Sequence, residues 1–307
     1  MPLDNFHIQT NRFSILTKDE LQARVPAIFQ TERNPDLSEK YVHITTESAL
    51  DMLIDSGFHP MSAVEKASKN AMNRVFARHL INFVNPDLIT DDAANIPLIS
   101  LYNSGNGKSS LQIIPSVNRK ACDNGLLVGE RLGGVKVRHT KSSFDPNLTV
   151  LENLQGLIDE TINHMTRVVE SVSNMRETSI HNDDALDFAF NAASLRWETI
   201  DESAFKDKDS ELTNNNYATL QTTAPAMLKV RREEDNGGDL WTVFNKTQES
   251  LVRGGVPVHR IDESRTCFCC GVKAPIERKA RPISDLDRLV TVNRSLWDMA
   301  DSVLETV

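Results

Sequence analysis

The chain has 307 residues, of which 39% are hydrophobic and 25% charged, and its formal net charge is −9. This composition excludes wholesale disorder, and the length suits one large domain or two small ones. No apolar run approaches the roughly 18 residues that cross a bilayer, and the amino terminus lacks the basic and apolar regions of a secretion signal. We therefore expect a cytoplasmic protein with no membrane partner.

Residues 1–40 are expected to form an amino-terminal extension with one short helix from Lys18 to about Phe29. From residue 41 we expect a single domain, rich in sheet over residues 41–141 and rich in helix over residues 147–307. The stretch TTESALDMLIDSGF predicts a helix capped by Thr46. Further along, NRVFARHLINFV fits a strand or a helix, and we favour a strand.

The stretch YNSGNGKSS, residues 102–110, ends like a phosphate-binding loop in Gly107-Lys108-Ser109. Such a loop needs a glycine five residues earlier, where Tyr102 stands, and a helix that starts at its Lys-Ser end. Strand-like residues and Pro115 follow instead. Asn106-Gly107 between two apolar runs is typical of a hairpin turn, whose two central residues take positive φ. We therefore predict a β-hairpin and no ATP site.

The rest of the chain predicts two short strands and then four helices. The strands lie in GLLVGERLGGVKVRHT, around Gly133-Gly134, and a long helix runs from Leu148 to about Arg176. Later helices are expected in NDDALDFAFNAASLRW, capped by Asn182 or Asp183, in DLWTVFNKTQESLVRGG and in the last stretch, SDLDRLVTVNRSLWDMADSVLETV. The polar segment 201–224 predicts a loop. The fold class is α+β: an antiparallel sheet with β-hairpins in the first half, packed against long helices in a β-β-β-α core.

Basic and acidic residues are unevenly distributed. Seven bases and two acids lie between Pro97 and Lys141, whereas ten acids and three bases lie between Glu177 and Glu211. A local positive field can attract an anion even though the total charge is negative. Charges on exposed strand edges that keep a sheet soluble are the alternative explanation. The candidate nucleic-acid-binding residues are Lys108, Arg119, Lys120, Arg131, Lys136, Arg138 and His139.

Few residues point to a metal or to catalysis. Cys267 and Cys270 in CFCCG have the spacing of a zinc half-site, but zinc normally needs two such pairs, so we favour buried free thiols. Such cysteine usage indicates a reducing compartment. Because no nucleophile elbow or metalloprotease spacing is present, we expect no cofactor and no enzymatic activity. A nuclease is the remaining enzymatic alternative, and it would need a metal site that these residues do not assemble.

The arrangement LISLYNSGNGKSSLQIIPSVNRKACDNGLLVG, followed by VKVRHT, resembles a phage- and plasmid-encoded family, the domain of unknown function numbered nine hundred and thirty-two. The family usually has a histidine after the hairpin serine, and Gly105 stands there in this chain. The resemblance implies a mobile-element protein made in the cytoplasm of a bacterial host, with no established activity. The matching positions are Asn103, Ser104, Gly107, Arg119, Cys122, Asn124, Gly125, Arg138, His139 and Thr140.

The predicted β-β-β-α order is similar to the core of single-strand annealing proteins of the Rad52 and Red-beta type. That similarity implies a homo-oligomer that holds single-stranded DNA in a basic groove, where cations contact phosphates. Our leading hypothesis is a non-enzymatic single-stranded-DNA-binding or annealing protein that acts in phage replication and recombination. The alternative is a host-takeover or anti-defence protein that binds a bacterial protein through the acidic surface from Asp183 to Glu211.

Overall fold

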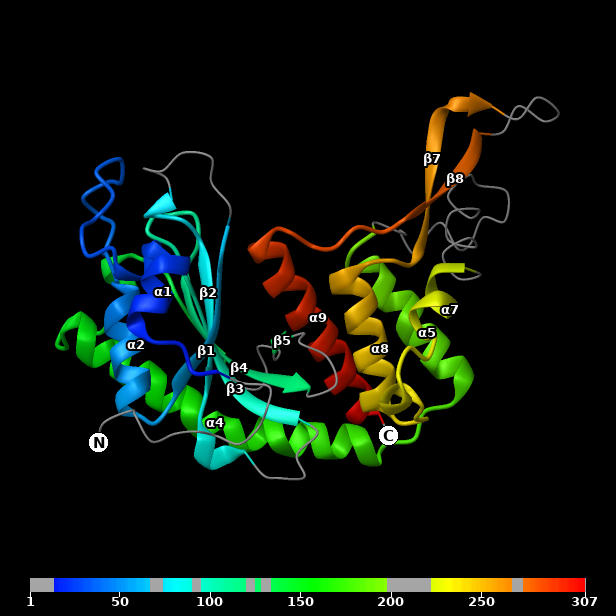
Figure 1. The fold of residues 1–307 in the computed structure, drawn as a ribbon, viewed down its shortest axis with the longest axis horizontal. Helices are drawn as coiled ribbons and strands as arrows, with labels where there is room; N and C mark the ends of the chain where they lie inside the picture. Colours follow the sequence, from blue (N-terminus) through cyan, green and yellow to red (C-terminus); the bar gives the residue numbers. More distant parts are fainter. Residues whose placement is uncertain are drawn as a thin grey trace. The chain divides into compact units, whose positions relative to one another are not determined.

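The computed structural model describes residues 14–66, 74–89, 95–119, 125–127, 134–197, 222–266 and 273–306. The chain divides into two compact units, Met1–Val169 and Glu170–Val307. Figure 1 shows the helices and strands of both units. The long helix α4, Val150–Glu177, begins in the first unit and ends in the second.

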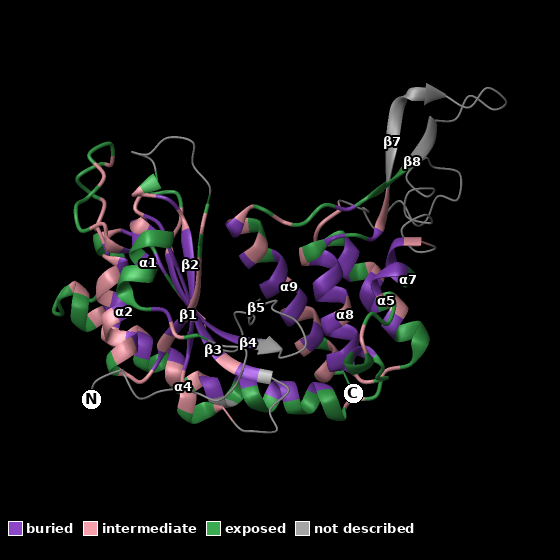
Figure 2. Cartoon of the chain, viewed as in Figure 1, coloured by how far each residue is buried: buried purple, intermediate pink, exposed green. Residues whose placement is uncertain are grey.

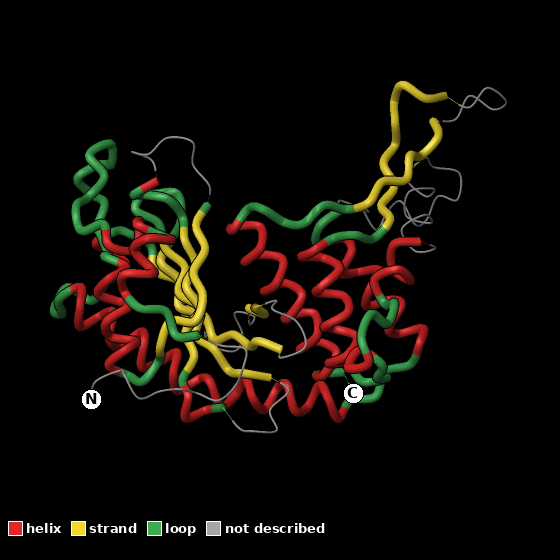
Figure 3. The backbone as a smooth tube through the Cα atoms, viewed as in Figure 1, coloured by secondary structure: helices red, strands yellow, loops and turns green. Residues whose placement is uncertain are grey.

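The first unit contains a six-stranded antiparallel sheet (Figure 3). Four strands follow the order β1-β2-β3-β4, and both β5 and β6 pair with β4, near its end and its start respectively. The sheet confirms the α+β class, and the strand preferred over a helix at NRVFARHLINFV is β2. The strands are β1 His59–Glu65, β2 His79–Val84, β3 Asn95–Asn103, β4 Leu111–Arg119, β5 Gly125–Leu127 and β6 Val135–Val137.

The helices of the first unit differ from the prediction in two places. The expected helix over 18–29 stops early, because Pro26 disfavours helical backbone at Val25, whose φ is −137°. Thr46 is not a cap: the helix starts at Thr46, and Thr45 is its N-cap without a side-chain bond. The elements are α1 Lys18–Arg24, α2 Thr46–Asp55 and the 3₁₀ turns η2 Pro26–Phe29, η3 Pro86–Leu88 and η5 Lys141–Ser143.

The two faces of this sheet have different chemistry, because successive side chains point to opposite faces. On one face the alternating apolar residues of β2, β3, β4 and β6 join α1, α2 and α4 in the main core (Figure 2). On the other face a polar ladder crosses four strands. Asn82 Nδ2 donates to Ser62 Oγ at 3.0 Å, Ser100 Oγ donates to Asn82 Oδ1 at 2.6 Å, and the hydroxyls of Ser100 and Ser116 lie 2.5 Å apart.

The second unit is mainly helical. Its central helix, α8 Leu240–Arg253, is buried along most of its length and ends at Gly254, which has φ +71° (Figure 2). The N-cap of α5 is His181, not Asn182 or Asp183. The hairpin of β7 Pro257–Thr266 and β8 Lys273–Lys279 was not expected in this half. The other elements are α5 Asn182–Ser194, α7 Ala224–Met227, the 3₁₀ turn η8 Glu233–Asp235 and α9 Leu286–Leu304.

Most of the polar segment 201–224 lies outside the described residues. Within the described ranges, no helix combines the length and the apolar character that a bilayer crossing requires.

Candidate functional site

Asn103, the last residue of β3, joins segments that are far apart in the sequence. Its Nδ2 donates to Ile44 O at 3.2 Å and to Thr46 Oγ1 at 3.0 Å. Its Oδ1 accepts from the Ser104 N–H at 2.8 Å and lies 3.0 Å from His139 Nε2. The buried amide therefore uses both donors and accepts the Ser104 N–H, which fixes its orientation.

His79 continues this network on the other side of Thr46. Its Nδ1 lies 2.9 Å from Ala77 O, and its Nε2 lies 2.9 Å from Thr46 Oγ1. Because a carbonyl only accepts, Nδ1 carries the proton and Nε2 accepts from the threonine hydroxyl. Burial lowers the pKa of His79 to about 4, although the bond to Ala77 opposes the shift. His79 is thus a neutral, fixed tautomer.

His139 and Tyr41 close the network. Their rings are stacked with centroids 4.9 Å apart, and the Tyr41 hydroxyl donates to Ser104 O at 3.3 Å. Burial raises the pKa of Tyr41 to about 12, so this donor stays protonated. Burial also lowers the pKa of His139, whose Nδ1 lies 3.1 Å from Val42 O. We call Tyr41, Thr46, His79, Asn103 and His139 the Asn103 network.

The hairpin between β3 and β4 lies next to this network. Residues 104–110 connect the strands, so the hairpin is confirmed, but its turn is wider than the predicted two residues. Gly107 has φ +70°, a backbone conformation that favours glycine, and a Cβ there would also displace Leu37 Cδ2, which would lie 2.7 Å away. Lys108 N–H donates to Asn106 Oδ1 at 3.0 Å. Strand β4 follows, where a phosphate-binding loop would need a helix.

Three of the predicted cations gather at this end of the sheet. Lys108 lies in the turn, Lys136 lies on β6 opposite Gln112 of β4, and Arg138 follows β6 directly. All three side chains are exposed. Within the described ranges, no ion pair involves any of them. We call Lys108, Lys136 and Arg138 the cationic edge.

The other predicted site residues are not part of this edge. Arg119 is the last residue of β4, seven residues beyond Gln112, which at about 3.3 Å per residue is about 23 Å away. Lys120, Arg131, Cys122 and Asn124 lie outside the described residues, and Gly125 starts β5. His139, which the sequence grouped with the cations, is only 6% exposed and its ring nitrogens face Asn103 and Val42.

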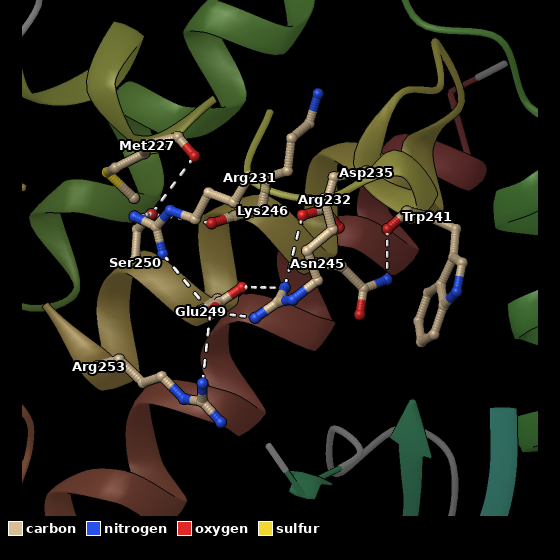
Figure 4. Close-up of polar contacts among 10 residues, drawn as sticks. All are labelled: Met227, Arg231, Arg232, Asp235, Trp241, Asn245, Lys246, Glu249, Ser250 and Arg253. Atoms are coloured by element: carbon tan, nitrogen blue, oxygen red, sulfur yellow. Dashed lines mark hydrogen bonds and ion pairs between the residues drawn. The ribbon is translucent and has the colours of Figure 1, made fainter. Parts of the chain in front are cut away.

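The second unit holds an ionic cluster around Glu249 of α8 (Figure 4). Arg232 donates two hydrogen bonds of 2.7 Å to this carboxylate. Arg231 and Arg253 form longer ion pairs with its Oε1, at 3.7 and 3.6 Å. Burial raises the pKa of Glu249, but the bonds and charges of the three arginines outweigh burial, and the pKa lies below its ordinary value. Arg232 also lies 3.5 Å from the buried Asp235. The cluster ties residues 231–235 to α8.

The structure gives no support for a metal site in its described part, where no three His, Cys, Asp or Glu side chains are grouped to hold an ion. Cys267 and Cys270 lie outside the described residues, so the zinc half-site is not tested.

Comparison with known proteins assigns the chain to a family. Residues 36–297 match the family described as Domain of unknown function (DUF932). The chain belongs to this family. It is similar to two proteins of Escherichia coli strain K12, UPF0380 protein YfjQ at 29% identity and UPF0380 protein YafZ at 28% identity, each over 94% of this chain and 92% of the relative. No solved structure matches the chain.

Three of the positions that the sequence matched to this family, Asn103, Ser104 and His139, lie at or beside the Asn103 network. Asn103, Ser104 and His139 are all buried there, and Ser104 Oγ has no hydrogen-bond partner among the described residues. Nothing in the sequence indicated a role for His79 or Tyr41. Their partners are separated from them by 33 to 98 positions, and neither periodicity nor spacing gives a signal for such contacts.

Proposed function

We propose that the protein binds single-stranded DNA through the cationic edge. The observation that supports this proposal is the convergence of three exposed cations from the turn, from β6 and from the residue after it, none of which forms an ion pair with a described residue. Cations without a carboxylate partner are free to neutralise phosphates, which releases counterions and drives binding. The Asn103 network supports the edge, because it fixes Asn103, which precedes the hairpin turn, and His139, which follows Arg138.

The net charge of −9 opposes binding elsewhere on the molecule, so the interaction depends on the local field. The role in annealing and in phage recombination is the finer part of the proposal, and the sheet-then-α4 order supports it.

The test is a fluorescence anisotropy titration of labelled oligo(dT) at low and at moderate salt. We expect binding at low salt that weakens as salt rises. Replacing the cationic edge by K108Q/K136Q/R138Q is expected to lower the slope of log affinity against log salt by about 2, because each lost single-strand phosphate contact accounts for about 0.7. Solution mass with and without the oligonucleotide then shows whether DNA drives assembly.

A matched triple variant removes three other exposed cations of the first unit, K18Q/R24Q/R167Q. It changes the net charge equally but leaves the cationic edge intact, so its affinity and salt slope are expected to stay close to those of the wild type. Absence of binding at low salt would refute the proposal. An equal loss in both triple variants would show non-specific attraction instead.

A further inference from the structure

The second unit contains a pocket of about 660 Å³ that the DNA-binding proposal does not use. It is enclosed by residues 178–180, by α5 and by the carboxyl-terminal end of α9. Its volume falls within the roughly 300–1,000 Å³ of small-molecule sites. Five lining side chains are apolar and offer a surface for an apolar ligand body: Ile180, Phe188, Leu195, Met299 and Val303.

Most of the hydroxyl groups in the lining offer acceptors rather than donors, and the remaining polar side chains are those of Ser179, Asn191 and two aspartates. Four hydroxyl groups of the lining each donate their single proton to a main-chain carbonyl, so that only their lone pairs remain for a ligand. The bonds run from Thr178 to Asn174 at 2.8 Å, from Ser194 to Asn191 at 2.5 Å, from Ser302 to Asp298 at 2.8 Å and from Thr306 to Val303 at 2.8 Å.

The main chain of the pocket wall is also occupied. Ile180 N–H donates to Gly238 O and Leu240 N–H donates to Thr178 O, both at 2.9 Å. These two bonds hold the wall segment against the start of α8, and they leave the Ile180 N–H unavailable to a ligand. A ligand that itself accepts hydrogen bonds would therefore find few donors here apart from the Ser179 hydroxyl and the Asn191 amide.

The charge of the lining has one sign. Asp184 and Asp187 of α5 are exposed and line the pocket, and no Lys, Arg or His is among the lining residues. Because they are three positions apart on a helix, the two carboxylates lie on the same face. Two carboxylates on one helix face, in a lining that also offers hydroxyl lone pairs, complement a group that is positively charged and rich in N–H donors.

We propose that this pocket binds a small organic cation, with its apolar body against Phe188, Met299 and the neighbouring apolar residues and its protonated amine between Asp184 and Asp187. The pocket lies in the second unit and would bind a cation, whereas the cationic edge of the first unit would bind an anion. This proposal is therefore independent of DNA binding.

The probe is dansylcadaverine, an apolar fluorophore that carries a primary amine, added to the full-length protein. We expect its fluorescence to rise as the dansyl group enters the pocket. Dansylglycine, which carries the same fluorophore with a carboxylate, is expected to give no rise. In D184N/D187N the affinity for dansylcadaverine is expected to fall about tenfold or more, because two charge-assisted bonds are lost.

Asp183→Asn is the matched control, since Asp183 is exposed on the same helix but does not line the pocket. It is expected to bind dansylcadaverine as the wild type does. Ser302→Trp fills the pocket from the exposed end of α9 and is expected to abolish the signal while circular dichroism stays unchanged. The proposal is overturned if both probes bind equally, if D183N weakens binding as much as D184N/D187N, or if no fluorescence rise occurs.

Discussion

A buried histidine stabilises a fold only in the protonation state that its neighbours accept. His79 is 1% exposed and is held as a neutral imidazole between Ala77 O and the Thr46 hydroxyl. Protonation would turn Nε2 into a second donor, so the Thr46 hydroxyl, which also accepts from Asn103, could no longer donate to it and would have to redirect its proton. A single residue thus links the stability of the first unit to pH.

We predict that the free energy of unfolding falls as pH drops from about 6.5 to about 4. The folded-state pKa of His79, about 4, lies below its ordinary value of 6.5. In that pH range the unfolded chain therefore binds more protons than the folded chain. The stabilisation is complete above about pH 6.5, and about 3 kcal/mol is lost on reaching about pH 4. His139, whose pKa burial also lowers, adds to the same trend.

Urea unfolding from about pH 8 to about pH 4 measures this dependence. His79→Gln is expected to be less stable than the wild type at the upper end, because it loses the two bonds of the imidazole, and to show a shallower decline with acid. His181→Gln changes an exposed histidine and is expected to keep the wild-type slope. An unchanged slope in His79→Gln would rule out His79 as the source.

Among the elements, α8 shows how a polar helix is kept in the interior of a unit. Gln248 donates to Asn293 of α9 at 2.8 Å, and Glu249 is gripped by Arg232. The carboxylate is only 5% exposed, so its charge is tolerated only because arginines surround it. Arg253 is different, since its side chain is 46% exposed and its contact with Glu249 is 3.6 Å long.

Glu249→Gln is therefore expected to lower the free energy of unfolding by about 3 kcal/mol, because three arginines lose their common partner in a buried site. Arg253→Gln removes only a half-exposed contact and is expected to cost no more than about 1 kcal/mol. Chemical denaturation of both variants measures the difference. Equal costs would mean that burial of Glu249 contributes little.

The sequence predicted the elements whose apolar residues repeat regularly. The helices α4, α8 and α9 and the hairpin β3–β4 occur where periodicity and Asn106-Gly107 placed them. The sequence did not predict β7 and β8, because PVHRIDESRT and KAPIERK are rich in charged residues and have too few apolar residues for a clear alternation. It also misplaced the caps at Thr46 and at the start of α5, because a residue that suits a cap can be used elsewhere, as Thr46 is by His79.

At the scale of the whole molecule, the candidate sites depend on contacts that cross long stretches of chain. The uneven charge distribution predicted Lys108, Lys136 and Arg138 as candidates, but their grouping follows from the register of β6 on β4. The pocket of the second unit depends on α5 and α9, which are about a hundred residues apart in the chain. It also depends on hydroxyl groups whose orientation is set by their bonds to main-chain carbonyls.

The division into two compact units makes a final prediction. His79 belongs to the first unit and Glu249 to the second, and the bonds described for them share no partner. Substitutions at independent sites add within about 0.5 kcal/mol. We therefore expect the double variant H79Q/E249Q to lose the sum of the two single losses, measured at neutral pH by urea unfolding with all four proteins compared. Two separate unfolding transitions, each shifted by only one of the substitutions, would also indicate that the two units unfold independently. A coupling energy above about 1 kcal/mol would contradict it and would show that the two units share their stability.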